Sequence, residues 1–99
     1  MKLTEKQYRD PRENENISVE QVIALACELA SKALDIYWQD NFPHMEMDKV
    51  DKNGEVTGEY TELAQDKFNM IYDDIEGVIV SLMEKHPDQN ILKIEALIN

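Results

Sequence analysis

Apolar residues begin to recur at helical spacing after a polar leader, and the start of the first long helix can be read from the residues around position 18. Ser18 is a preferred N-cap residue, and Gln21 lies three positions later, as in a capping box. Ile17 and Val22 occupy the positions of a hydrophobic staple on either side of the cap. A helix is therefore expected to begin at Val19.

The same helix is predicted to continue to about Asn41. Phe42 is followed by Pro43, and a residue before proline is driven out of the helical conformation. At about 100° per residue, the apolar side chains of this segment cover roughly half of the helix circumference. A stripe of this width indicates that the helix packs on more than one side.

A second long helix is predicted to begin near Gly58 and Glu59 and to end at His86, before Pro87. Nine apolar residues fall within an arc of about 140° and form the expected packing face: Ala64, Phe68, Ile71, Tyr72, Ile75, Val78, Ile79, Leu82 and Met83. The opposite arc holds Glu62, Asp66, Asn69, Asp73, Glu76 and Glu84. One side of this helix should pack, and the other should form an acidic ridge.

The remaining segments complete a mainly α-helical domain over residues 17–99, preceded by a polar arm over 1–16. After Pro87, Asp88 is expected to cap a short C-terminal helix, which is clamped against the long helices or a second subunit because its residues are largely apolar: Ile91, Leu92, Ile94, Leu97 and Ile98. Residues 42–58 contain Asn53-Gly54, a turn pair that suits a two-stranded hairpin. An irregular loop is the alternative, because an isolated hairpin is marginally stable in water.

Charge narrows the classes of partner. The chain has 21 acidic and 10 basic residues and therefore a net charge of −11. Residues 1–12 have a net charge of +2, so residues 13–99 have a net charge of −13. A domain this acidic should repel nucleic acid and anionic lipid and attract basic protein surfaces, although a high net charge can also serve solubility alone.

Cys27 is the single cysteine and is expected to be buried. The leader has no apolar run like that of a signal peptide, so we expect a soluble cytoplasmic protein.

A calcium site is the first chemistry that the acidic stretch at 48–60 suggests. Placing Gly54 at the sixth position of an EF-hand loop puts Asp51 and Asn53 at ligand positions. However, the first position is then Lys49 and the twelfth is Tyr60, where oxygen donors of a carboxylate are needed. The stretch is therefore interpreted as a turn and not as a calcium loop.

A magnesium site is the second chemistry tested. Glu59 and Glu62 are spaced like one half of the carboxylate site of helical nucleotide pyrophosphohydrolases, and Asp73 and Glu76 like the other half. Both pairs lie on one predicted helix, which rises about 25 Å from residue 59 to residue 76, so the two pairs cannot converge on one ion. Acids of the first helix, such as Glu28 and Asp35, remain an alternative source of ligands.

No catalytic motif is found. The sequence has no glycine-rich phosphate loop, nucleophile elbow or zinc-ligand spacing. Tyr37, Trp38 and Phe42 cluster at the end of the first helix and are interpreted as core residues, with an interface as the alternative. We therefore expect neither an enzyme nor a cofactor or metal site.

The sequence thus favours a non-catalytic module that binds a basic protein surface. The expected contact residues are Glu62, Asp66, Asp73 and Glu76 of the second helix, with Asp48, Asp51, Glu55 and Glu59 of the connection. In composition the chain is similar to small acidic proteins of phages and mobile elements that inhibit host enzymes by occupying their DNA-binding sites. One acidic ridge carries roughly one charge per 7 Å, which is sparser than duplex DNA at about one per 1.7 Å, so a DNA mimic would need a dimer or the charges of the connection.

Two other functions stay open. Ala26, Ala30 and Ala33 allow close approach of another helix, which suits a structural homodimerisation module. A metal-dependent enzyme that uses helix-borne carboxylates is the third hypothesis.

Overall fold

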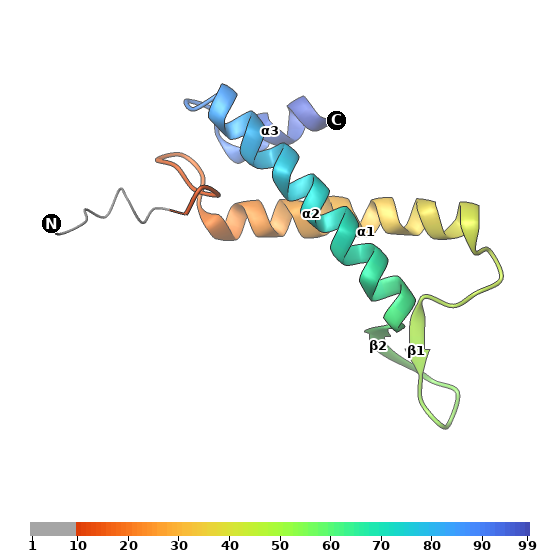
Figure 1. Cartoon of the computed structure of the whole chain (residues 1–99). Coiled ribbons are helices and arrows are strands. Elements are labelled where there is room, and N and C mark those ends of the chain that lie inside the picture. The colour runs from red at the N-terminus through yellow and green to blue at the C-terminus, as the bar shows by residue number, and fades with distance from the viewer. Residues whose placement is uncertain (1–9) are drawn as a thin grey trace, which may run out of the picture.

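The computed structural model describes residues 10–99, and residues 1–9 of the predicted arm lie outside this range. The elements follow in the order α1 (Val19–Asn41), β1 (Asp48–Val50), β2 (Val56–Tyr60), α2 (Glu62–Lys85) and α3 (Ile91–Ile98). Two long helices, a short C-terminal helix and a hairpin between the long helices confirm the predicted mainly α fold. In Figure 1, α2 crosses α1 obliquely, α3 lies beside one end of α2, and the hairpin projects from the other end.

α1 has the predicted capping box. The Ser18 side chain accepts the N–H of Gln21, and the Gln21 side chain accepts the N–H of Ser18. The helix ends at Asn41, and the N–H of Phe42 is bonded to the carbonyl of Trp38. Both predicted ends are thus confirmed.

The buried side of α1 follows a row of every fourth residue. Val22, Ala26, Ala30, Leu34 and Trp38 are all buried, with exposed fractions of 4% or less. Rows of this kind pack best against the equivalent row of a helix inclined by about 50°. Because the row winds about 40° per step around α1, the two halves of the helix face different neighbours.

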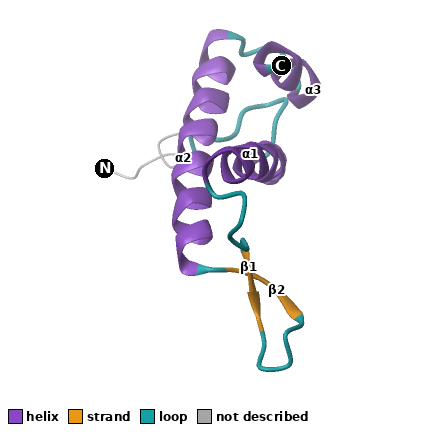
Figure 2. Ribbon diagram, turned by 90° about the vertical axis from the view of Figure 1, so that its right-hand side faces the viewer, coloured by secondary structure: helices purple, strands orange, loops and turns teal. Residues whose placement is uncertain are grey.

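The core accordingly has two parts. The three-helix end contains the buried residues Ile17, Val22, Leu25, Ala26, Ile79, Met83 and Ile94, contributed by α1, α2, α3 and the segment before α1. The hairpin end contains Leu34, Trp38 and Ala64, covered by the partly buried Phe42, Met47, Tyr60, Phe68 and Ile71. Figure 2 views α1 nearly end-on, with α2 along one side of it, α3 near one end of α2 and the hairpin below.

The connection between the long helices forms the hairpin, which resolves the two alternatives left by the sequence. β1 and β2 are antiparallel, with Asp48 opposite Tyr60 and Val50 opposite Val56. Three residues of β2 therefore oppose one of β1, and Gly58 within this bulge has φ +85°. Trp38 anchors the base of the hairpin through a 2.7 Å hydrogen bond from its Nε1–H to the carbonyl of Met45.

α2 begins later than predicted. Gly58 and Glu59 belong to β2, and the helix starts at Glu62 after the N-cap Thr61, whose Oγ1 accepts the N–H of Ala64. The left-handed conformation of Gly58 is incompatible with a helix, and the N–H of Thr61 donates to the carbonyl of Met47 across the hairpin. Strand pairing therefore outcompetes the helical pattern over these residues.

The described part of the predicted arm, residues 10–16, lies against the three-helix end. Asn14 Oδ1 accepts the N–H groups of Asn16 and Ile17, each at 2.8 Å. Asn16 Nδ2 donates to the carbonyl of Pro87, just after α2. These bonds hold the buried Ile17 at the entrance to α1.

Several apolar residues predicted to pack are exposed. Cys27 is exposed, so its predicted burial is wrong, and Val78 is 49% exposed although it was assigned to the packing face of α2. Ile36, on the far side of α1 from the buried row, is 65% exposed because α3 covers only the N-terminal half of that helix. Within residues 10–99, no helix has the length and apolar content needed to cross a membrane.

Candidate functional site

A groove opens where β2 joins α2, and we call it the hairpin groove. It has a volume of about 770 Å³ and is lined by Lys49 of β1, by Gly58, Glu59 and Tyr60 of β2, and by Glu62, Gln65 and Asp66 of α2. Two of the predicted helix acids and one acid of the predicted connection therefore meet at one place. The turn at Thr61 brings them together, because it ends the strand and caps the helix.

The groove has an excess of negative charge. Glu59, Glu62 and Asp66 carry three carboxylates, whereas Lys49 is the one cation among the lining residues. Lys49 Nζ lies 4.0 Å from Glu59 Oε2, and both side chains are at least half exposed, so this ion pair is weak. The groove can therefore attract a cationic group without first breaking a strong internal salt bridge.

One lining residue of the groove, Tyr60, is aromatic. Tyr60 packs against Phe68, with ring centroids 5.7 Å apart, and Phe68 packs against Tyr72. Gln65 Nε2 donates to Asn69 Oδ1 one turn along α2. The lining thus offers carboxylates, amide oxygen and the face or edge of an aromatic ring, which together suit the ammonium of lysine or the guanidinium of arginine.

The acids of the connection have different surroundings. Asp51 Oδ1 accepts the N–H groups of Asn53 and Glu55, at 2.8 and 3.0 Å, so this carboxylate shapes the turn. Gly54 in the turn has φ +82°, which accounts for the glycine of the predicted Asn53-Gly54 pair. Glu55 is exposed near the tip, and Asp48 is half-buried at the base of the hairpin. Of the four connection acids, only Glu59 lines the groove.

The exposed acidic residues of α2 continue the negative surface beyond the groove. Glu62, Asp66, Asp73 and Glu84 are exposed and lie on one side of the helix, and we call them the acidic row. Glu62 and Asp66 belong to both the row and the groove.

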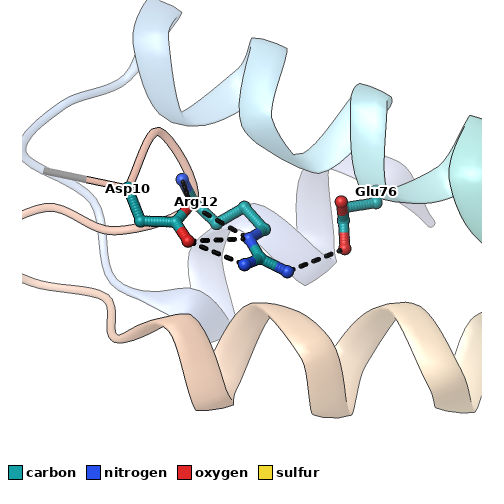
Figure 3. Close-up of polar contacts among 3 residues, drawn as sticks. All are labelled: Asp10, Arg12 and Glu76. Carbon is teal, nitrogen blue, oxygen red and sulfur yellow. Dashed lines mark hydrogen bonds and ion pairs between the residues drawn. The ribbon is translucent and has the colours of Figure 1, made fainter. Parts of the chain in front are cut away.

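Glu76 was predicted to belong to this surface, and the structure places it elsewhere. Its side chain is only 24% exposed, and Glu76 Oε2 lies 3.6 Å from Arg12 Nη1 (Figure 3). That oxygen is buried and has no hydrogen-bond partner among residues 10–99. The sequence periodicity misplaced this residue because Glu76 stands at the border between the packed and the open faces of α2, where the segment before α1 covers it.

Arg12 is held between two carboxylates. It makes three hydrogen bonds to Asp10 through its Nε and Nη2 atoms, the shortest at 2.7 Å (Figure 3). The hydrogen bonds from the Arg12 side chain and backbone lower the pKa of Asp10 to about 2, and the same pairing raises the pKa of Arg12. Sequence reasoning missed this cluster because Arg12 and Glu76 are far apart in the chain and no local motif links them.

Tyr72 lies beside this cluster. Its burial, and then its interaction with the Glu76 carboxylate, raise the pKa of the phenol to about 12. The nearby Arg12 acts in the opposite direction and lowers it. The tyrosine is thus kept neutral, and the group of three charges and one phenol ties the start of the domain to the middle of α2.

Metal chemistry gains no support from the geometry. Across residues 10–99, no three histidine, cysteine, aspartate or glutamate side chains converge as metal ligands would. The helix acids Glu28 and Asp35 join no such group, and Glu28 is paired with Lys32 at 3.3 Å. His44 is exposed in a loop and His86 forms the C-cap of α2.

Similarity to known proteins adds nothing to these observations. The chain matches no protein-family model, no curated protein and no solved structure. The chemistry of its own surface is therefore the basis on which a function has to be inferred.

Proposed function

We propose that this chain is a non-catalytic binding module that holds a basic surface of another protein in the hairpin groove and along the acidic row. The observation that carries the proposal is the convergence of Glu59, Glu62 and Asp66 from two elements around one open groove. Among residues 10–99, Lys49 is the one cation that lines this groove, so these carboxylates attract cations and complement lysine and arginine side chains.

A paired-variant experiment tests the proposal. A partner is captured from the native cells at low salt and identified by mass spectrometry, and calorimetry then measures its Kd. Glu62→Gln with Asp66→Asn should weaken binding by about tenfold or more, which corresponds to ~1.4 kcal/mol. The matched control is Asp35→Asn with Asp40→Asn, which removes the same charge from exposed positions of α1 and should change Kd by less than about twofold.

The control variant distinguishes a loss of affinity that comes from the groove from one that comes from the lower net charge. Equal weakening by both pairs of substitutions would show that only net charge matters, and the groove would not be the site. Binding that is unchanged by either pair would contradict the proposal altogether.

The narrower function is inhibition of a DNA-binding protein by covering its basic surface. It is supported by the net charge of −11 together with the added carboxylates of the hairpin. Duplex DNA should then compete with the chain for the captured partner, and both interactions should weaken steeply with salt. A partner that binds DNA and the chain simultaneously would contradict this narrower function.

Structural homodimerisation is a second candidate, and one observation favours it. A groove of about 290 Å³ between α1 and α3 is lined by Ala24, Leu25, Ile91 and Leu92, with Gln21, Glu28 and Glu95 at its rim. Leu92 is 71% exposed. If a second copy covers this groove, the wild-type chain sediments as a dimer and Leu92→Gln as a monomer.

A further inference from the structure

An exposed apolar stripe runs along the side of α2 that does not pack. Leu63, Met70 and Val78 are 49%, 62% and 49% exposed, and they are spaced by seven and eight residues. This spacing places them within about 100° of arc over a length of about 22 Å. We call these three residues the α2 stripe.

Gly77 lies in line with the α2 stripe. It is in the middle of a helix, where glycine lowers helix stability relative to alanine. Its φ is not positive, and a Cβ atom added there would meet nothing within 4 Å. Packing within the fold therefore gives no reason for glycine at this position. A residue without a side chain beside exposed apolar residues would, however, let a second helix approach the backbone of α2 closely.

Charged residues flank the stripe unequally. On one side lies the acidic row, with Glu62, Asp66 and Asp73. Other charged residues lie within the arc of the stripe itself: Asp74 is exposed one turn from both Met70 and Val78, and Lys85 is exposed beyond Val78. Lys67, one turn from Leu63, places its Nζ 4.1 Å from the centre of the Tyr37 ring, so this lysine is already engaged with α1. The surroundings of the stripe are thus predominantly negative.

We infer that the α2 stripe and the acidic row together bind an amphipathic α-helix of a partner protein, with apolar residues on one face and lysine or arginine beside them. The three apolar residues at near-heptad spacing supply one of the two contact positions per heptad for the apolar face of another helix, and Asp74 between Met70 and Val78 can pair with a basic residue of that helix. The acidic row would pair with the basic flank, and its Glu62 and Asp66 would lead the end of that helix into the hairpin groove.

A second copy of this chain is the poorer occupant of the stripe. Its net charge is −11, and it would bring a second acidic row against the first. The inference rests on the proposed function, because the basic partner is the same, and it specifies the partner's conformation and the apolar contact that it makes.

The probe for the test is a designed 21-residue peptide with leucine at the a and d positions and lysine at the e and g positions of each heptad. Its own lysines repel one another, which keeps it from pairing with itself. The peptide is titrated into the full chain by calorimetry at 0.15 M salt. A second peptide, with glutamate in place of each lysine, serves as the charge-reversed probe.

Leu63→Gln with Met70→Gln should weaken binding of the lysine peptide by about tenfold or more. Ile36→Gln is the matched control, because Ile36 is 65% exposed on α1 and outside the stripe, and it should change Kd by less than about twofold. Since all three positions are exposed, the variants should keep the helical circular dichroism of the wild type. The glutamate peptide should bind at least tenfold more weakly than the lysine peptide.

The outcomes separate the inference from the proposed function. If Glu62→Gln with Asp66→Asn weakens binding of the captured partner and of the peptide but the stripe variant does not, the inference falls and the proposed function stands. If neither variant weakens either interaction, both fall. The inference is also overturned if the lysine peptide does not bind, if Ile36→Gln weakens it equally, or if the wild type is a dimer that the stripe variant dissociates.

Discussion

In its N-terminal half α1 packs against α2, α3 and the segment before Ser18, whereas in its C-terminal half it packs against α2 and the base of a hairpin. At the three-helix end seven apolar residues of the described range are buried, including Ile79 and Ile94 at 0% exposure. At the hairpin end only Leu34, Trp38 and Ala64 are buried, and aromatic rings that remain partly exposed cover them.

The difference follows from the covering elements. A two-stranded hairpin has few side chains with which to enclose a core, and both faces of β2 are largely exposed. The same poor coverage leaves the hairpin groove open at this end. The molecule thus separates a closed end that stabilises the fold from an open end that displays charge.

Removing a large buried side chain should have the largest effect, and it should be greater at the closed end. Ile79→Ala should lower the free energy of unfolding by about 3–4 kcal/mol, and Leu34→Ala by about 2–3 kcal/mol, because partly exposed neighbours can relax into the space left by Leu34. Urea unfolding followed by circular dichroism measures both. An equal or reversed order would contradict the contrast between the two ends.

Trp38→Phe should act mainly at the open end. It removes the donor to the Met45 carbonyl, and we expect a loss of about 1–2 kcal/mol. Hydrogen exchange should become faster over residues 45–61 and remain unchanged in α3. Tyr37→Phe, at the neighbouring position, is the control and should change stability by less than about 0.5 kcal/mol. Faster exchange in α3 would show that the two ends unfold as one unit.

The caps of the two long helices should differ in strength. Ser18→Ala removes one side of a reciprocal capping box and should cost about 1 kcal/mol. Thr61→Ala removes a single hydrogen bond of 3.3 Å, so we expect a loss of about 0.5 kcal/mol. Ser81→Ala makes the same kind of change at an exposed position inside α2 and should be neutral or slightly stabilising. Thermal unfolding of the three variants would rank them, and a costlier Thr61→Ala would contradict this order.

The smallest effect on stability should come from Asp10, in the segment that lies against the three-helix end. The pKa of Asp10 is lowered to about 2 by Arg12, so the folded state binds this proton more weakly than the unfolded chain does. The stabilisation is present above about pH 4 and is lost as the pH falls toward 2. Asp10→Asn should therefore lower the urea midpoint at pH 7 and match the wild type near pH 2.

Glu15→Gln is the control for Asp10→Asn, since it removes one charge from an exposed position of the same segment. A direct check is the NMR titration of the Asp10 carboxyl carbon. A midpoint at the ordinary value for aspartate would show that Arg12 does not hold this carboxylate in solution.

Local signals predicted the elements of the fold well. Ser18, Gln21 and the Phe42-Pro43 pair placed both ends of α1 correctly, since caps and proline act within a few residues. Asn53-Gly54 correctly marked the turn between the strands. The start of α2 was predicted too early because the pairing of β2 with β1, which opposed the helical pattern at Gly58 and Glu59, is not a local property.

The candidate site was predicted in part. Acidity and helical phase single out Glu62 and Asp66, the acidity of the connection singles out Glu59, and the fold brings these three together. Glu76 was named on the same grounds and proved to face Arg12, and the exposed apolar stripe at Leu63, Met70 and Val78 was not anticipated. Helical phase shows which residues share a side, but it does not show how far a neighbouring element extends over that side.

The sequence by itself determined the presence of the three helices, both ends of α1, the turn and the uneven charge, because each depends on residues that are close in the chain. It did not identify Thr61 and Asn90, which cap α2 and α3. Only the tertiary structure decided which parts of each helix are covered. α2 crosses α1 obliquely along a row that winds around α1, so burial changes from one half of the helix to the other. Cys27 and Ile36 are exposed, Ile36 because α3 covers only the N-terminal half of α1, and the small hairpin leaves the groove beside α2 open. These features depend on packing between residues that are distant in sequence.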